Sequence, residues 1–135
     1  HQNNWSFSLG KKILSKEIPG HFVAESGEFF AILDINPLAK GHVLVIPKIE
    51  IDYIFDLEPE ILSEYLVFSK KVAKAIEKVI PCERIGVSVI GLEVPHAHIH
   101  LVPINSISDL DFSRPKLSLS TEEFEDIRVK IANAF

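Results

Sequence analysis

Apolar residues recur along the chain with two different periods, and the longest regular stretch has the period of a helix. Between Pro59 and Ile80 they return every three or four positions, with Lys and Glu on the opposite face. Pro59 is favourable in the first turn of a helix, and Pro81 cannot continue one. The pattern predicts one long helix over residues 59–80. Its buried stripe should contain Ile61, Leu62, Tyr65, Leu66, Val72, Ala73, Ile76, Val79 and Ile80.

Shorter apolar runs before and after this helix predict five strands. These runs are rich in β-branched and aromatic residues, and turn-forming residues separate them. Asn36 and Pro37 begin a turn that allows the third run to pair antiparallel to the second. The predicted strands cover residues 21–26, 28–35, 42–47, 84–90 and 96–103.

Both ends of the chain predict additional helices. Residues 11–20 have the pattern of a short helix. Ser120 and Glu123 form a capping box, and residues 104–119 before them predict an irregular loop. The final helix has an apolar face formed by Phe124, Ile127 and Ile131. This order of elements predicts an α+β fold, with helices packed on a largely antiparallel five-stranded sheet, in a single domain over residues 1–135.

The composition of the chain limits which binding partners and which cellular environment we expect. A net charge of −5 gives no general attraction to nucleic acids or to anionic membranes, so neither is expected as a partner. The single cysteine, Cys82, cannot form an internal disulfide. The sequence contains neither an apolar run of about 20 residues nor the apolar stretch of a secretory signal. We therefore expect a soluble cytoplasmic protein.

The segment PHAHIHLVP, residues 95–103, places histidines at every second position. On a strand, alternate side chains point to the same face, so His96, His98 and His100 should share one face. The residues between them can fill the core from the other face. Each buried imidazole needs partners for two ring nitrogens, which makes three histidines a poor choice for packing alone. The intervening apolar residues are Ala97, Ile99 and Leu101.

Three interpretations of this histidine row compete. The histidines could be structural, with their ring nitrogens satisfied or solvated. They could bind zinc, since His-x-His on a strand can place two nitrogens on one metal, although no Cys-x-x-Cys or carboxylate pair completes the set. They could also act on a phosphorus centre, because a neutral imidazole is a nucleophile near pH 7 and its neighbours can donate hydrogen bonds to phosphoryl oxygens.

The residues HAHIHLV match the signature of the histidine triad (HIT) family, in which histidines alternate with apolar residues. Two more segments, KILSKEIP at residues 12–19 and FFAILDINPLAKGHVLVIPK at residues 29–48, resemble the family in the same order. The similarity runs over about residues 12–104, and residues 105–135 supply the loop and the C-terminal helix. The chain resembles the Hint-like, nucleotide-binding branch most, which implies a HIT-like fold.

The resemblance implies a role for each of four histidines. His98 matches the middle histidine, which attacks the α-phosphorus and transiently carries the nucleotidyl group. His100 would bind phosphate oxygens and help to protonate the leaving group, and His96 would orient the neighbouring imidazole. His42 matches an additional active-site histidine of the family, and for it a structural role is equally open.

The resemblance also implies a nucleotide site. Asp34 would accept hydrogen bonds from both ribose hydroxyls, although it could instead cap the turn that follows it. Five apolar residues resemble those that enclose the base, and core packing is the alternative for each: Ile13, Leu14, Ile18, Ile32 and Ile35. The implied reaction releases a nucleoside monophosphate, of the AMP type, from a phosphoramidate or phosphoester through a nucleotidyl-histidine. The resemblance further implies a purine nucleotide as substrate and a homodimer, for which the long helix offers a surface.

The loop before the triad departs from the family pattern. Leu92 stands where an amide is expected, and Glu93 stands where a small hydroxyl residue usually touches phosphate. A carboxylate beside a phosphate is repulsive, by about 1 kcal/mol at 4 Å even in bulk water. Glu93 either turns away or meets a positive group of the substrate. Two alternatives therefore stay open: hydrolysis of dinucleoside polyphosphates, and a nucleotide- or metal-binding module with little turnover. No cofactor is required, and zinc is possible but not expected.

Overall fold

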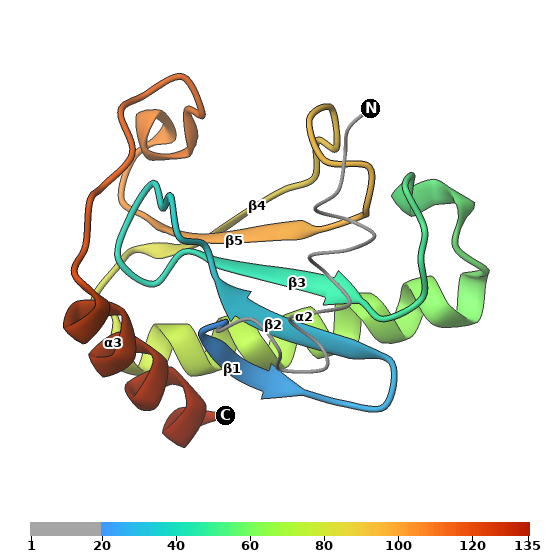
Figure 1. Ribbon diagram of the computed structural model, residues 1–135, viewed down its shortest axis with the longest axis horizontal. Helices are drawn as coiled ribbons and strands as arrows, with labels where there is room; N and C mark the ends of the chain where they lie inside the picture. Colours follow the sequence, from blue (N-terminus) through green and yellow to red (C-terminus); the bar gives the residue numbers. More distant parts are fainter. Residues whose placement is uncertain (1–19) are drawn as a thin grey trace.

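A computed structural model describes residues 20–135, which build one antiparallel sheet with two helices against it (Figure 1). The strand order is β1-β2-β3-β5-β4, and every neighbouring pair is antiparallel. This arrangement confirms the predicted α+β class and the five-stranded sheet. The strands are β1 (Phe22–Glu25), β2 (Phe29–Leu33), β3 (Val43–Pro47), β4 (Arg84–Ser88) and β5 (Ile99–Ile104).

Two α-helices and two short 3₁₀ helices complete the fold. They are η2 (Ile54–Asp56), α2 (Pro59–Val79), η3 (Ile107–Leu110) and α3 (Thr121–Ala134). Helix α2 matches the predicted span to within one residue. The capping box of α3 is also as predicted: the Glu123 N–H donates to the Ser120 hydroxyl at 3.1 Å, and the Ser120 N–H donates to the Glu123 carboxylate at 3.0 Å. None of the helices in this part of the chain is long and apolar enough to cross a lipid bilayer.

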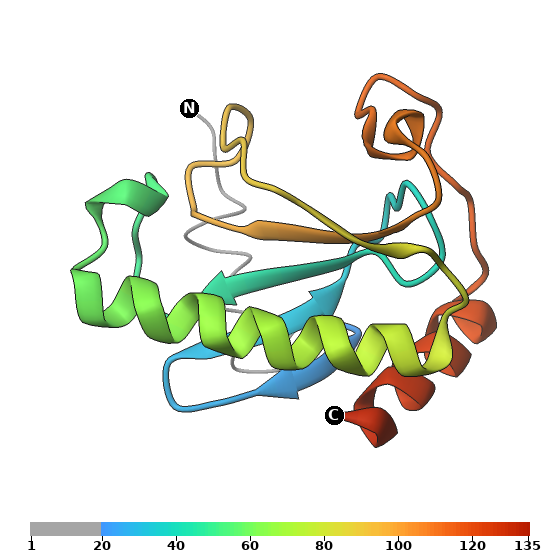
Figure 2. The ribbon, with the colours of Figure 1, turned by 180° about the vertical axis from the view of Figure 1, so that it is seen from behind.

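The two faces of the sheet have different surroundings. Alternate residues of β3 and β5, such as Val45 and Leu101, belong to the main core, which they share with α2 and α3. Figure 2 shows α2 running across this face of the sheet. The residues between them point to the other face, where Ile32 pairs with Leu44 and Leu44 pairs with His100. The strand period therefore places His100 on the face opposite the helices.

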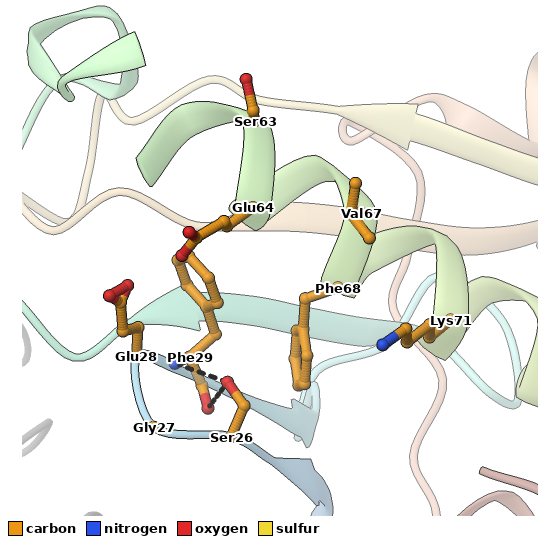
Figure 3. Close-up of a pocket in the computed structure, with 9 residues that line it drawn as sticks. All are labelled: Ser26, Gly27, Glu28, Phe29, Ser63, Glu64, Val67, Phe68 and Lys71. Atoms are coloured by element: carbon orange, nitrogen blue, oxygen red, sulfur yellow. Dashed lines mark hydrogen bonds between the residues drawn. The ribbon is translucent and has the colours of Figure 1, made fainter. Parts of the chain in front are cut away.

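Aromatic packing fixes α2 on the sheet. The ring of Tyr65 stacks on Phe29 with centroids 5.1 Å apart, and its hydroxyl donates to the Val45 carbonyl at 2.6 Å. Phe68 packs against the same Phe29 ring at 5.8 Å. Phe29 and Phe68 line a groove of about 410 Å³ between α2 and the β1–β2 turn (Figure 3). Leu66, which the sequence places in the buried stripe, is instead 62% exposed, because the stripe follows Tyr65 and Phe68.

Other boundaries correct the predictions from sequence. The strand predicted over residues 96–103 begins only at Ile99. The residues before it bond elsewhere: the Ala97 N–H donates to the Ile51 carbonyl at 2.7 Å rather than to β3. The strand predicted over residues 84–90 ends at Ser88, and the predicted loop contains η3. The helix predicted over residues 11–20 lies, apart from Gly20, outside the described residues.

Candidate active site

The face of the sheet opposite the helices carries a cavity of about 750 Å³. The structure brings seven of the sequence-predicted residues together in its wall: Ile32, Asp34, Ile35, His42, Glu93, His98 and His100. One further candidate within residues 20–135, His96, does not line the cavity. His96 is buried, with its Nε2 2.9 Å from the Pro47 carbonyl oxygen. Ile13, Leu14 and Ile18 lie outside the described residues.

A backbone carbonyl sets the protonation of the His98 ring. His98 Nδ1 lies 2.8 Å from the carbonyl oxygen of His96, and a carbonyl can only accept, so Nδ1 carries the proton. In the neutral ring Nε2 is then the nitrogen with the lone pair. His98 lines the cavity, so a ring with a nucleophilic nitrogen lies where a ligand can bind. His96 thus orients the neighbouring imidazole through its carbonyl group.

His42 and His100 form a hydrogen-bonded pair with the opposite polarity. The Leu38 N–H donates to His42 Nδ1 at 3.0 Å, so the neutral His42 ring must carry its proton on Nε2. His42 Nε2 lies 3.0 Å from His100 Nδ1 and donates to it. His100 Nδ1 is therefore an acceptor, and the proton of the neutral His100 ring is on Nε2. The relay makes the neutral His100 ring a hydrogen-bond donor at the cavity.

Local backbone structure places His42 for this relay. Gly41 has φ of +90°, a conformation that favours glycine, and the His42 N–H closes the turn on the Ala39 carbonyl at 3.1 Å. A Cβ atom at Gly41 would also lie 2.9 Å from the Ile80 side chain at the end of α2. The turn that ends at His42 thus places the His42 ring at the cavity, within hydrogen-bonding distance of the Leu38 amide.

Burial keeps the histidine pair neutral. It lowers the pKa of His42 to about 3, and the nearby His100, Lys116 and His98 act in the same direction. The pKa of His100 is lowered to about 4, mainly by burial and further by electrostatic interaction with His98. His42 Nε2 also lies 3.5 Å from Asp34 Oδ2, but this contact is not an ion pair, since His42 is uncharged at neutral pH. The relay therefore works by hydrogen bonds and without a buried imidazolium.

Asp34 caps the turn that follows it and also lines the cavity. Its Oδ1 accepts from the Asn36 N–H at 2.9 Å, which caps the turn after β2. The same carboxylate also lines the cavity, and its side chain is 18% exposed. Burial raises the pKa of Asp34, and the Asn36 amide, His98 and Lys116 act against that rise. The group is thus a partly buried acceptor beside His42.

Comparison with known proteins decides the family. The HIT domain model matches residues 15–107, which is most of the chain. The chain belongs to the HIT family. An adenosine 5′-monophosphoramidase of Schizosaccharomyces pombe is 34% identical over 125 residues, which covers 90% of this chain and 93% of that protein. An asymmetrical bis(5′-nucleosyl)-tetraphosphatase of the same yeast is 33% identical over 98 residues, which covers 69% of this chain and 52% of that protein.

Solved structures of HIT proteins have the same fold. The crystal structure of a Hit-like protein from Bartonella henselae has a TM-score of 0.81 and is 28% identical, and the alignment covers 100% of this chain and 99% of that one. The histidine cavity therefore lies on a fold shared with other HIT proteins. Its loop before the triad keeps the departures seen in the sequence: Leu92 is 89% exposed, and Glu93 is exposed at the cavity wall.

Residues 112–117, which lie beyond the family match, contribute to this HIT site. The Phe112 ring packs edge-on against His100, with centroids 4.7 Å apart, and Lys116 also lines the cavity. The Leu117 N–H donates to the Pro37 carbonyl at 2.9 Å, which ties the segment to the turn that positions His42. Sequence reasoning missed both side chains, because residues 104–119 have no periodic pattern and lie beyond the resemblance.

One set of side chains in the described residues has the spacing of a metal site. One ligand atom each of Asp34, His42 and His100 lies within 4.8 Å of the others. A metal-bound histidine usually donates its other ring N–H to a protein acceptor. His42 does the reverse, because its Nδ1 accepts from the Leu38 amide, so Nε2 holds the proton that a metal would have to displace. The arrangement fits a hydrogen-bond relay better than a metal centre.

Proposed function

We propose that this HIT protein is a nucleotide hydrolase that releases a nucleoside monophosphate from a phosphoramidate or a phosphoester. The observation that carries the proposal is the His98 ring, whose Nδ1 donates to a backbone carbonyl while the ring lines a cavity beside a histidine relay. The relative named as an adenosine 5′-monophosphoramidase, which aligns with 90% of this chain, supports an AMP-type substrate.

In the first step, His98 Nε2 attacks the α-phosphorus of the bound nucleotide. Its lone pair forms the N–P bond while the bond from phosphorus to the leaving group breaks and its electron pair departs with the leaving group. The leaving nitrogen or oxygen takes up a proton as it departs. The product is a nucleotidyl-His98, in which the ring keeps its Nδ1–H bond to the His96 carbonyl.

His100 serves the phosphoryl group as a donor. With its Nδ1 accepting from His42, the Nε2–H can bond to a non-bridging oxygen whose negative charge increases as the leaving group departs. A pKa of about 4 leaves His100 neutral in the free protein near pH 7. The leaving group takes its proton from solvent, since a second proton on His100 Nδ1 would meet the Nε2–H of His42.

In the second step, water attacks the same phosphorus. The new oxygen–phosphorus bond forms as the N–P bond breaks, the electron pair returns to His98 Nε2, and the water releases a proton. The product is the nucleoside monophosphate. No metal takes part in the proposed route, and the protonation of His42 Nε2 supports this. Asp34 would hold the ribose hydroxyls, and Ile32 and Ile35 would contact the base.

A second candidate function is the hydrolysis of dinucleoside polyphosphates. The relative named as a bis(5′-nucleosyl)-tetraphosphatase favours it. The cavity volume of about 750 Å³ lies well within the range of about 300–1,000 Å³ that is typical of small-molecule sites. The same His98 chemistry would serve both activities, which differ only in the leaving group.

We also propose that the protein forms a homodimer. Leu66 and Val67 of α2 are 62% and 55% exposed. Burying such apolar side chains between two copies would stabilise a dimer.

Hydrolysis of adenosine 5′-monophosphoramidate by wild-type protein and by His98→Ala tests the proposed function. We expect the substitution to remove at least about 10³-fold of kcat, because the reaction loses its nucleophile. Trapping of a radiolabelled adenylyl group on the wild type, and not on His98→Ala, would identify the intermediate. Equal rates in the two proteins would rule out His98 as the nucleophile. Lys70→Ala, on the exposed side of α2, serves as the control for a substitution away from the cavity.

A further inference from the structure

The histidine cavity has an unusual balance of fixed charge for a site that binds an anion. Among the described residues that line it, Asp34 and Glu93 are acidic, and Lys116 is the only lysine or arginine. His42 and His100 add no charge near pH 7, since burial lowers their pKa values to about 3 and about 4. A nucleotide entering the cavity therefore meets two carboxylates and one ammonium group.

The fold holds Lys116 in place at this cavity. Its Nζ donates to the Phe112 carbonyl at 2.6 Å and to the Arg114 carbonyl at 3.0 Å. An ammonium group has three N–H bonds, so these two contacts leave a third for a ligand. The next residue is bonded to the backbone of Pro37, and the Phe112 ring rests on His100, so both sides of Lys116 are anchored to the site.

The charge of Lys116 acts on the reacting end of the cavity. Burial raises the pKa of Asp34, and the positive charge of Lys116 is among the influences that oppose this rise. Burial also lowers the pKa of His42, and Lys116 acts in the same direction. Lys116 is thus close enough to interact with a phosphate that lies beside these two side chains.

We propose that Lys116 binds a phosphate oxygen of the substrate and supports the binding of nucleotides that carry additional phosphate groups. The inference rests on the proposed function and specifies its substrate class. Each added phosphate increases the repulsion from Asp34 and Glu93 and the attraction to Lys116. Substrates with a polyphosphate leaving group therefore depend on Lys116 more than AMP derivatives with an uncharged amine do.

The test compares two substrates in three variants. Lys116→Gln removes the charge, Lys116→Arg keeps it, and Lys70→Gln removes a lysine from the exposed side of α2. The substrates are diadenosine tetraphosphate and adenosine 5′-monophosphoramidate. We expect Lys116→Gln to lower kcat/KM about tenfold for the tetraphosphate, which corresponds to the weaker hydrogen bonds to charged groups. For the phosphoramidate, kcat/KM should fall no more than about threefold. Lys116→Arg should restore most of the loss, and Lys70→Gln should match the wild type.

Binding measurements separate this inference from the proposed function. Calorimetry with AMP and ATP needs no turnover, and Lys116→Gln should weaken ATP binding more than AMP binding. If the wild type binds both nucleotides but hydrolyses neither substrate, the proposed function fails, and the ATP-to-AMP affinity ratio alone decides the role of Lys116. An unchanged ratio in Lys116→Gln, or equal losses for the two substrates, would overturn the inference. Failure of the wild type to bind either nucleotide would overturn both.

Discussion

Acidification should destabilise this protein at a pH where most of its carboxylates still carry their charge. The cause is the pair His42 and His100, which the fold keeps neutral by burying both rings. Their pKa values fall from the ordinary 6.5 to about 3 and about 4. In the unfolded chain both rings are exposed and take up protons near pH 6.5. Between about pH 6.5 and pH 4 the unfolded state therefore binds more protons than the folded state.

The sign and size of the effect follow from this difference. Stability rises with pH wherever the unfolded state binds more protons, so it is lost as the pH falls through the window. Each ring then contributes a loss of about 2 kcal/mol between pH 7.5 and pH 5, and the pair loses about 4 kcal/mol. This is a large part of a typical free energy of unfolding, about 5–15 kcal/mol. Burial raises the pKa of Asp34, which offsets part of the loss at the acid end.

Urea unfolding at pH 7.5, 6.5, 5.5 and 5.0 measures the effect, with the free energy of unfolding extrapolated to water at each pH. The matched variant is His42→Gln, which removes one titrating ring. Its free energy at pH 7.5 should be lower than that of the wild type, because the buried His100 Nδ1 loses the donor that it bonds in the wild type. Its loss from pH 7.5 to pH 5 should be smaller than that of the wild type by about 2 kcal/mol.

Two results would refute this reasoning. Wild-type stability that stays constant within about 0.5 kcal/mol from pH 7.5 to pH 5 would mean that the paired rings are not held neutral. An identical pH dependence in the wild type and in His42→Gln would mean that other groups cause the destabilisation. Either result would also remove the basis for His100 as a neutral donor to phosphate.

Two further substitutions test the ends of the cavity. Asp34→Asn keeps an oxygen for the Asn36 amide but loses the charged acceptor. The value of kcat/KM should therefore fall about tenfold for ribonucleotide substrates and much less for their 2′-deoxy analogues. Equal losses would exclude a contact with the ribose 2′-hydroxyl. Glu93→Gln removes an exposed carboxylate from the cavity wall. It should lower KM for diadenosine tetraphosphate about threefold without changing the melting temperature. An unchanged KM would show that Glu93 faces away from the phosphates.

Periodic features of the sequence predicted most of the fold. The helical stripe located α2 to within one residue, and apolar runs located all five strands, because both patterns arise from burial on one face. The boundary of β5 was wrong because the histidine row continues the alternation past the point where the backbone leaves the sheet. The Ala97 amide bonds to Ile51, and nothing in the local pattern encodes that long-range contact.

The site was less predictable than the fold, because its chemistry depends on contacts between distant segments. The histidine row identified His98 and His100, but no sequence pattern tells which ring nitrogen carries the proton. That is decided by the amide of Leu38 and the carbonyl of His96. Lys116 was missed for a related reason: it reaches the cavity from a segment without periodicity, through the bond from Leu117 to Pro37.

The protonation of the two neighbouring rings explains how one short segment can supply both a nucleophile and a hydrogen-bond donor. His98 has its proton on Nδ1, which leaves Nε2 basic, whereas His100 accepts on Nδ1 and keeps its proton on Nε2. The rings lie 4.9 Å apart, and a charge on either one would repel a proton from the other. Opposite tautomers let the uncharged forms of the two rings take these two roles. The positive charge that an anionic substrate needs can then come from Lys116, which lines the same cavity but does not have to change its protonation during the reaction.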